Sequence, residues 1–376
     1  MVRTGSQFAT VLNTNSADKE IKGSSGGWKE TPLSNDWSQT VGLPVTFVFR
    51  PSFYNLLAWT SVQIDARQGR EVSPRSLFYQ SLSLKSLESL IQNPKTRWSD
   101  AVLVGTASII AGEALVSNPQ NMAVHAQALS NIQRHRKRAG YWTPPEIDQF
   151  VSYISIYAIA GITSHLSGLS MAKASSDEVM ELTEDRAVFY GVLEELNAWS
   201  LDSCAFNNGA KRKLELSLSS DIVHALAIPQ SGIHEACQVY TMLYLVIALY
   251  HHRGSPREGS LLISEVNSSF TKLDDRSIAS LAWLLAKRNN DKSEHRDRAL
   301  QMLRVYWGLQ ATNKALVTAF LRSFFDNDGR QPLMLQEAAM THIKYELFSG
   351  ADSSLTTAQT GKFCHLTGPY GVLPLL

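Results

Sequence analysis

The sequence predicts an all-α protein, built as one large array of antiparallel helices in a single main domain. Apolar residues recur at spacings of three and four, which is typical of helices that bury one face. Proline and capping residues mark several helix starts. One buried helical face of this kind comprises Val179, Leu182, Val188, Val192 and Leu196. Only Leu43–Phe49 shows some strand character, and it is short.

Helix starts are marked by serine or threonine followed by proline. Ser73-Pro74 places proline at a first helical position, and Thr143–Glu146 and Ser255–Glu258 are predicted capping boxes with proline at the start. Ser175–Glu178 is a further box. The expected helices are Pro51–Gln68, Pro74–Ile91, Asp100–Val116, Met122–Arg138, Pro144–Gly168, Glu178–Trp199, Ile233–His252, Pro256–Phe270, Arg276–Arg288, Arg296–Leu309, Asn313–Phe325 and Leu333–Phe348.

Composition places the chain among globular proteins. Its 376 residues are 44% hydrophobic and 18% charged, enough to bury a sizeable core. The formal net charge is +1, so no global field attracts nucleic acid or anionic membrane. The three cysteines, Cys204, Cys237 and Cys364, are far apart and odd in number, which predicts no disulfide framework and a reducing compartment.

The chain divides into a tail and one domain. Residues 1–43 are rich in Ser, Gly, Asn and Thr and predict a flexible N-terminal tail, which leaves residues 44–376 for the helical domain. The tail has no apolar segment typical of a signal peptide, so we expect a cytoplasmic protein. Ala101–Leu115 and Val239–Tyr250 are strongly apolar but shorter than a membrane span, and are expected to be buried helices.

The order of several short motifs resembles a known family. Trp98–Leu103 opens an apolar helix, and Met122–Gly140 follows it. His234–Cys237, an apolar helix and His252–Ser255 come later, and Ala282–Leu285 lies within another helix. Together these segments resemble the helical middle homology domain of fungal zinc-cluster transcription factors, over most of residues 50–328. Within Met122–Gly140 the resemblance rests on His125, Ala126, Leu129, Ile132, Arg138 and Gly140.

The chain departs from that family in its cysteines. The zinc cluster of the family uses six closely spaced cysteines, and three scattered cysteines cannot build it. No helix-turn-helix or basic arm replaces it, so we expect no direct contact with nucleic acid. Two interpretations follow: a regulator that acts through partners, or a domain recruited to another task. Non-canonical fungal humulene synthases, which are helical and bind farnesyl diphosphate through magnesium, suggest the second.

The leading functional hypothesis is therefore a non-canonical class I sesquiterpene cyclase that ionises farnesyl diphosphate with Mg²⁺ as cofactor. Such an enzyme needs cations on the leaving pyrophosphate and an apolar pocket for the carbocations. Lys287 and Arg288 follow Trp283 by about one helical turn, and are the predicted pyrophosphate-binding residues. Trp283, Leu285 and Tyr244 are the predicted pocket residues. The alternative is a solvated helix end above ordinary core residues.

Carboxylates are the predicted ligands of the magnesium ion. Asp326 and Asp328 follow two phenylalanines at a helix end, which resembles part of the aspartate-rich motif of class I cyclases. Asp65 closes an otherwise apolar helix, and Glu181 and Asp185 share one helical face. The alternative for each is an exposed or capping acid.

The second functional hypothesis is a transcription regulator without its own DNA contact, which dimerises or binds a true transcription factor. The basic run Arg134–Arg138 then serves as a possible nuclear import signal. A cationic helix end before Gly140 is the alternative interpretation of that run. This hypothesis predicts nuclear localisation and allows a homodimer, whereas the enzyme predicts an isoprenoid diphosphate as the bound partner.

Overall fold

The computed structural model describes residues 41–70, 73–115, 119–166, 176–205, 218–288, 293–325 and 333–348. Within these ranges the chain forms fourteen helices and no strand, which confirms the all-α prediction. The first five are α3 (Leu43–Val48), α4 (Arg50–Arg67), α5 (Pro74–Gln92), α6 (Asp100–Leu115) and α7 (Pro119–Arg138). The next five are α8 (Pro145–Leu166), α9 (Ser176–Ala205), α10 (Ser220–Ala227), α11 (Ile233–His251) and α12 (Pro256–Phe270). The last four are α13 (Ile278–Lys287), α14 (Ser293–Gly308), α15 (Ala311–Ser323) and α16 (Glu337–Phe348).

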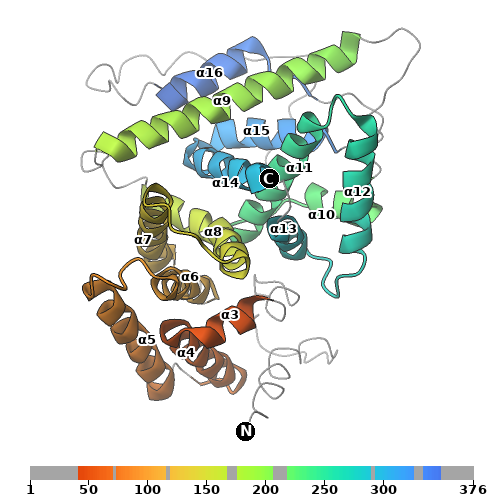
Figure 1. The fold of residues 1–376 in the computed structure, drawn as a ribbon. Coiled ribbons are helices and arrows are strands. Elements are labelled where there is room, and N and C mark those ends of the chain that lie inside the picture. The colour runs from red at the N-terminus through yellow and green to blue at the C-terminus, as the bar shows by residue number, and fades with distance from the viewer. Residues whose placement is uncertain are drawn as a thin grey trace.

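The helices form two groups that meet at α8. Helices α3 to α7 pack on one another at one end of the molecule, and α8 joins them to the group around α11 (Figure 1). Helix α11 packs on α8, α13, α14 and α15, and the long helix α9 lies across α14 with α16 beside it. The predicted tail lies mostly outside the described residues, since the first described helix begins at Leu43.

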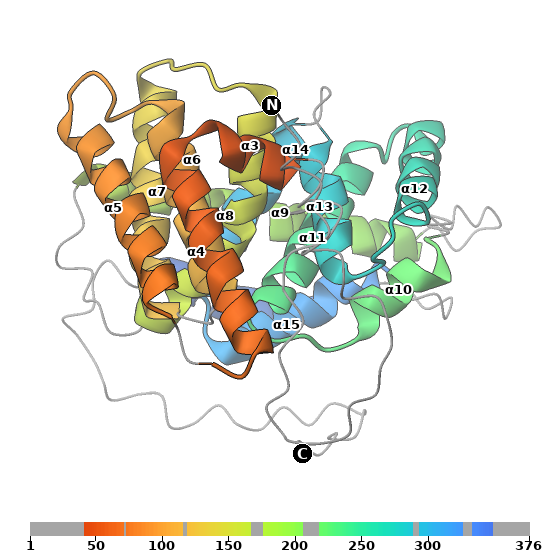
Figure 2. The same ribbon diagram turned by 90° about the horizontal axis from the view of Figure 1, so that it is seen from below.

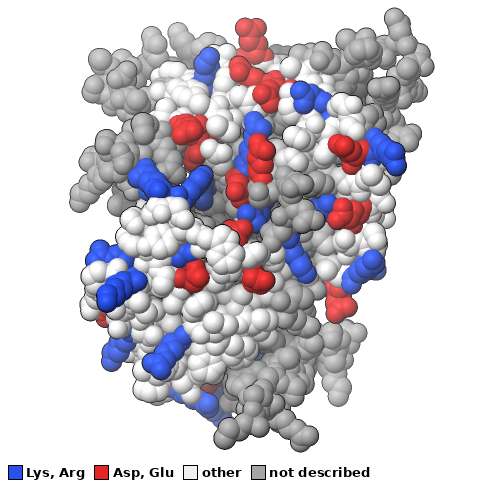
Figure 3. Space-filling view, in the orientation of Figure 1, with Lys and Arg blue, Asp and Glu red and all other residues white. Residues whose placement is uncertain are grey.

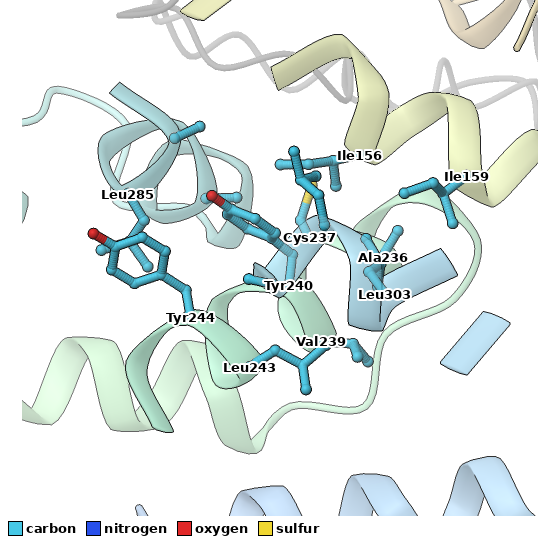
Figure 4. Close-up of a cluster of buried hydrophobic side chains, with 14 of the residues drawn as sticks. Ile156, Ile159, Ala236, Cys237, Val239, Tyr240, Leu243, Tyr244, Leu285 and Leu303 are labelled. Carbon is cyan, nitrogen blue, oxygen red and sulfur yellow. The ribbon is translucent and has the colours of Figure 1, made fainter. Parts of the chain in front are cut away.

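Helix α11 is the centre of the core. Every residue from Ala236 to Leu249 is buried, so the helix is surrounded on all sides. A helix that is apolar all round is stable only inside a protein or a membrane. It is long and apolar enough to cross a bilayer, but 78% of that segment is buried inside the molecule, which is the pattern of a core helix. Figure 4 shows part of this cluster, where α11 meets side chains of α8 and α14.

Helix α6 approaches α4 closely because it carries glycine on that face. A Cβ atom built on Gly112 would lie 2.0 Å from Nε1 of Trp59, and one on Gly105 would lie 3.0 Å from Cβ of Pro51. Nothing larger than hydrogen fits at Gly112 without moving the indole ring. The two glycines are seven residues apart, and thus lie on the same face of the helix.

Two local predictions were wrong. Leu43–Phe49 is mostly helix, with Pro44 in the first turn and Thr46 Oγ1 donating to the carbonyl of Leu43 at 2.9 Å. Its β-branched residues favour a strand, but packing against α4 and α6 outweighs that preference. The predicted capping box at Ser255–Glu258 does not form. Ser255 does not cap α12 through its side chain, and Glu258 turns toward His252, with Oε2 3.0 Å from Nδ1.

Candidate functional site

The two predicted pyrophosphate-binding cations lie at the end of α13. Lys287 is exposed, and its Nζ atom lies 5.8 Å from the ring centroid of Trp283, one turn earlier. Arg288 is already paired, because its Nη2 atom lies 2.7 Å from Oε2 of Glu265 on α12. That ion pair ties the end of α13 to α12. Only Lys287 therefore presents an unpaired charge that a diphosphate would meet without displacing a carboxylate.

The three predicted pocket residues are parts of the packed core. Trp283, Leu285 and Tyr244 have no accessible surface, whereas a cavity wide enough for water would leave some on the side chains that line it. The ring of Trp283 meets Tyr153 edge-on, with 5.4 Å between centroids. Burial raises the pKa of the Tyr244 phenol, and the positive charge of Arg288 opposes that shift. Core packing accounts for all three positions, and their role in a pocket stays a prediction.

The predicted magnesium ligands are not brought together within the described residues. Asp65 is buried, and its Oδ2 atom accepts a hydrogen bond from the backbone N–H of Ser73 at 3.1 Å, which joins the end of α4 to the start of α5. Asp326 and Asp328 lie outside the described residues. Across the described ranges, no group of three or more His, Cys, Asp or Glu side chains is placed to hold a metal ion.

Asp65 and Lys287 also belong to different parts of the fold. Helix α4 packs on α3, α5 and α6, whereas α13 packs on α8, α10, α11 and α12. Asp185, another predicted ligand, accepts a hydrogen bond from Gln301 at 2.5 Å, and the side chain of Glu181 is not described.

The basic run at the end of α7 has a buried residue at its middle. Arg136 is 4% exposed and donates to the carbonyl of Trp98 at 2.5 Å and to the carboxylate of Asp100 at 2.6 Å. It also donates to the carbonyl of Trp142 at 3.2 Å and to Oγ1 of Thr143 at 3.1 Å. One guanidinium thus joins the start of α6, the end of α7 and the turn before α8. Because this residue is buried in a folded helix, the run is not presented as an extended basic peptide, which argues against the predicted import signal.

Aromatic and basic side chains surround Arg136 at the surface. The rings of Trp98 and His135 are stacked, with 3.8 Å between centroids. Tyr141 and Trp142 follow the helix and are 51% and 75% exposed. We call this surface the basic–aromatic corner. It consists of the exposed cations Lys95, Arg97, Lys137 and Arg138 together with Trp98, His135, Tyr141 and Trp142.

The corner carries more basic than acidic side chains. Asp100 is the carboxylate at its centre, and the ion pair with Arg136 neutralises it. Glu146, at the start of α8, is exposed. Figure 3 shows more Lys and Arg than Asp and Glu over α5 and the neighbouring end of α7, whereas both signs mix over the upper part of this face. The corner therefore has a local positive potential on a chain of net charge +1.

The sequence indicated only part of this corner, because Lys137 and Arg138 belong to the predicted basic run but Lys95 and Arg97 do not. The run Arg134–Arg138 was visible as a charge cluster, whereas Trp98 lies about 40 residues earlier and Trp142 follows the helix stop at Gly140. Gly140 has φ of +68°, as expected of a helix-ending glycine in the left-handed region. The turn it makes brings Tyr141 back over Arg136, with 5.5 Å from the guanidinium carbon to the ring centroid.

Comparison with known families supports the resemblance for the first half of the chain. Residues 28–203 match the family described as the fungal specific transcription factor domain. The match includes two of the motifs that suggested it, Trp98–Leu103 and Met122–Gly140, while the later motifs lie beyond the matched residues. No curated protein and no solved structure matches the chain.

The structure gives a physical reason for those two motifs in this domain. Trp98 and Asp100 open α6, and Arg136 lies near the end of α7, so the two segments are joined by hydrogen bonds at the corner. The three cysteines of the chain are too few to build the zinc cluster of that family. The relation to humulene synthases stays a prediction.

Proposed function

We propose that this chain is a transcription regulator that acts through protein partners, and that the basic–aromatic corner binds an acidic segment of such a partner. The proposal rests on one observation: the corner is an exposed surface that lies within the residues that match the fungal specific transcription factor domain. Nuclear localisation belongs to this proposal. The cyclase hypothesis has no comparable support, because its two cations and its acids are not assembled in the described residues.

The chemistry of the corner fits an acidic segment that also carries apolar side chains. Each exposed ion pair contributes only about 0.2–1 kcal/mol, so four cations mainly orient and accelerate the encounter. Trp142 supplies a large, exposed apolar surface, and tryptophan is enriched among residues that dominate binding energy. Burial of Arg136 fixes the surrounding backbone, so little conformational entropy is lost on binding.

Duplex DNA fits this surface less well. A duplex carries one negative charge about every 1.7 Å and is read by an element that enters a groove. The corner instead gathers its cations on one short loop and one helix end, around two exposed rings. A compact basic surface with aromatic side chains suits a short peptide better than a groove-length contact.

A binding experiment with defined probes tests the site. A labelled peptide of alternating Glu, Leu and Phe is expected to bind with an affinity that falls as salt rises, and its Gln-for-Glu version is expected to bind weakly. The double substitution Lys137→Glu, Trp142→Ala should abolish binding. Lys272→Glu, which changes an exposed cation in the turn after α12, should leave it unchanged. Equal binding of both peptides, or tighter binding of single-stranded or duplex DNA, would overturn the assignment.

A reporter assay tests the regulatory role. Fusing the chain to a heterologous DNA-binding domain should change expression of a reporter gene, and the double variant should lose that effect while Lys272→Glu keeps it. No change in reporter expression, with a folded and nuclear fusion protein, would contradict the proposal.

A further inference from the structure

The turn between α7 and α8 contains a threonine that is followed by proline, Thr143-Pro144. Residues 141–144 form neither helix nor strand and lead directly into α8. Thr143 and Pro144 are half-buried, whereas the two residues before them and the two after them are exposed. This turn lies at the rim of the helical array, beside the connection between α5 and α6 (Figure 2). An enzyme that binds its substrate in an extended form can therefore reach this segment.

The hydroxyl group of Thr143 contacts the buried guanidinium of Arg136. Nη2 of Arg136 donates to Oγ1 of Thr143 at 3.1 Å, and the same atom donates to Oδ1 of Asp100 at 2.6 Å. Because the threonine oxygen accepts in this hydrogen bond, its own proton is not used in it. The Arg136 side chain is 5% exposed, and its hydrogen bonds hold the guanidinium in one position. A guanidinium is the side-chain group best suited to pair with a phosphate.

Two other hydroxyl residues precede a proline within the described ranges, and both differ from Thr143. The Oγ atom of Ser73 caps α5, where it accepts from the backbone N–H of Ser76 at 3.4 Å. Ser255 precedes α12 and makes no side-chain cap. Of the three hydroxyl groups, only that of Thr143 has a hydrogen bond to a cationic side chain among the described residues.

We infer that Thr143 is a phosphorylation site whose modification weakens binding at the basic–aromatic corner. The modifying enzyme is a protein kinase of the proline-directed class, with ATP as the phosphoryl donor. A bond forms between Oγ1 of Thr143 and the γ-phosphorus, and the bond from that phosphorus to the β–γ bridging oxygen breaks. The hydroxyl proton passes to the base of the kinase, and ADP leaves. Because the effect is on the corner, this regulation rests on the proposed function.

The surroundings of Thr143 favour the phosphorylated form. A phosphothreonine carries about −1.5 to −2 charges and three strong acceptor oxygens, which the Arg136 guanidinium can reach from its present position. Helix α8 begins two residues later, and the partial positive charge at its start also favours an anion. Glu146 and Asp148 in the first turn of α8 oppose this effect, but Asp148 is paired with Arg296 at 2.7 Å.

A phosphate at this position changes the charge of the corner. Thr143 directly follows Trp142, the most exposed aromatic residue of the corner, which is 75% exposed. Two added negative charges offset about half of the four exposed cations, and they repel the carboxylates of an acidic segment. Since each exposed ion pair contributes a factor of about 1.4 to 5 in affinity, losing two of them weakens binding roughly tenfold.

Mass spectrometry of the full chain tests the modification itself. The purified chain is incubated with ATP and a proline-directed kinase, and the same chain is also isolated from a yeast host. We expect one phosphoryl group on Thr143, which Thr143→Val prevents and Ser255→Ala leaves in place. An unmodified Thr143 both in the kinase reaction and in the chain from yeast would overturn the inference.

A binding assay tests the consequence for the corner. The phosphorylated chain should bind the labelled peptide of alternating Glu, Leu and Phe about tenfold more weakly than the untreated chain, and phosphatase treatment should restore the affinity. Kinase treatment of Thr143→Val should leave the affinity of that variant as it was before treatment.

The two experiments separate the two proposals. A chain that is modified at Thr143 but does not bind the peptide even before treatment contradicts the proposed function and supports the modification site. A chain that binds the peptide equally well before and after modification of Thr143 overturns the regulation and leaves the proposed function intact.

Discussion

Replacing Arg136 with methionine is expected to destabilise the protein although the residue belongs to a basic surface run. The Arg136 side chain is 5% exposed, and its partner Asp100 is 32% exposed. Removing one member of a buried ion pair costs about 3–5 kcal/mol, because the other member loses its compensation. Water can reach Asp100, so we expect the lower end of that range, about 3 kcal/mol. For a domain of this size the change corresponds to a fall in Tm of about 4 °C.

Thermal unfolding followed by circular dichroism measures this effect, with urea unfolding as a second readout. Lys137→Met is the matched control, since it removes an exposed cation from the neighbouring position and should change stability by less than about 0.5 kcal/mol. Arg136→Lys should also destabilise, because one ammonium cannot replace the four hydrogen bonds of the guanidinium. An unchanged Tm for Arg136→Met, or an equal fall for Lys137→Met, would refute the reasoning.

Four further predictions follow from the structure. Gly112→Ala should lower the free energy of unfolding by several kcal/mol, because its Cβ would overlap Trp59. Gly191→Ala, with nothing within 4 Å of its Cβ, should raise the free energy of unfolding by up to about 1 kcal/mol, and chemical denaturation measures both changes. Burial lowers the pKa of His125, so the unfolded chain binds the proton first and stability should fall as pH drops below about 6.5; His125→Gln should flatten that slope in urea titrations. Burial raises the pKa of Cys237 to about 12, so in a variant with serine at the other two cysteines the native protein should resist a thiol reagent that labels it once unfolded. Incubation with farnesyl diphosphate and Mg²⁺ should give no hydrocarbon by gas chromatography, and a cyclised product would favour the enzyme over the regulator.

Most helices could be predicted from the sequence because their signals are local. Ser73 caps α5 as expected, with its Oγ atom accepting from the N–H of Ser76 at 3.4 Å. Gly140, with positive φ, marks the stop of helix α7 as expected. Helix α10 (Ser220–Ala227) was missed, since eight residues give too short an apolar pattern to stand out. Helix α3 was predicted as a possible strand, because a short apolar run with β-branched residues does not distinguish a strand from a buried helix.

The proposed sites were harder to predict because their residues have several possible environments. Trp283 and Tyr244 are aromatic residues at helical spacing, and that pattern is the same for a pocket wall and for a filled core. From the sequence, Arg288 was predicted to be a free cation. Its partner Glu265 lies more than twenty residues earlier in the chain, and only the fold brings the two side chains together. In Arg134–Arg138 the sequence shows five basic residues but not which one is buried.

By itself, the sequence determined the helical class, most helix boundaries and the family resemblance, because propensity, capping and apolar periodicity act over a few residues. Only the tertiary structure decided that Arg136 is a buried connector and that Leu77, Leu84 and Ile91 face solvent. Burial and ion pairing depend on which distant helix covers a given face. On α5 the covered face carries Ser76, Ser83 and Leu87, because these are the positions that α4 and α6 reach, and larger apolar side chains beside them stay exposed.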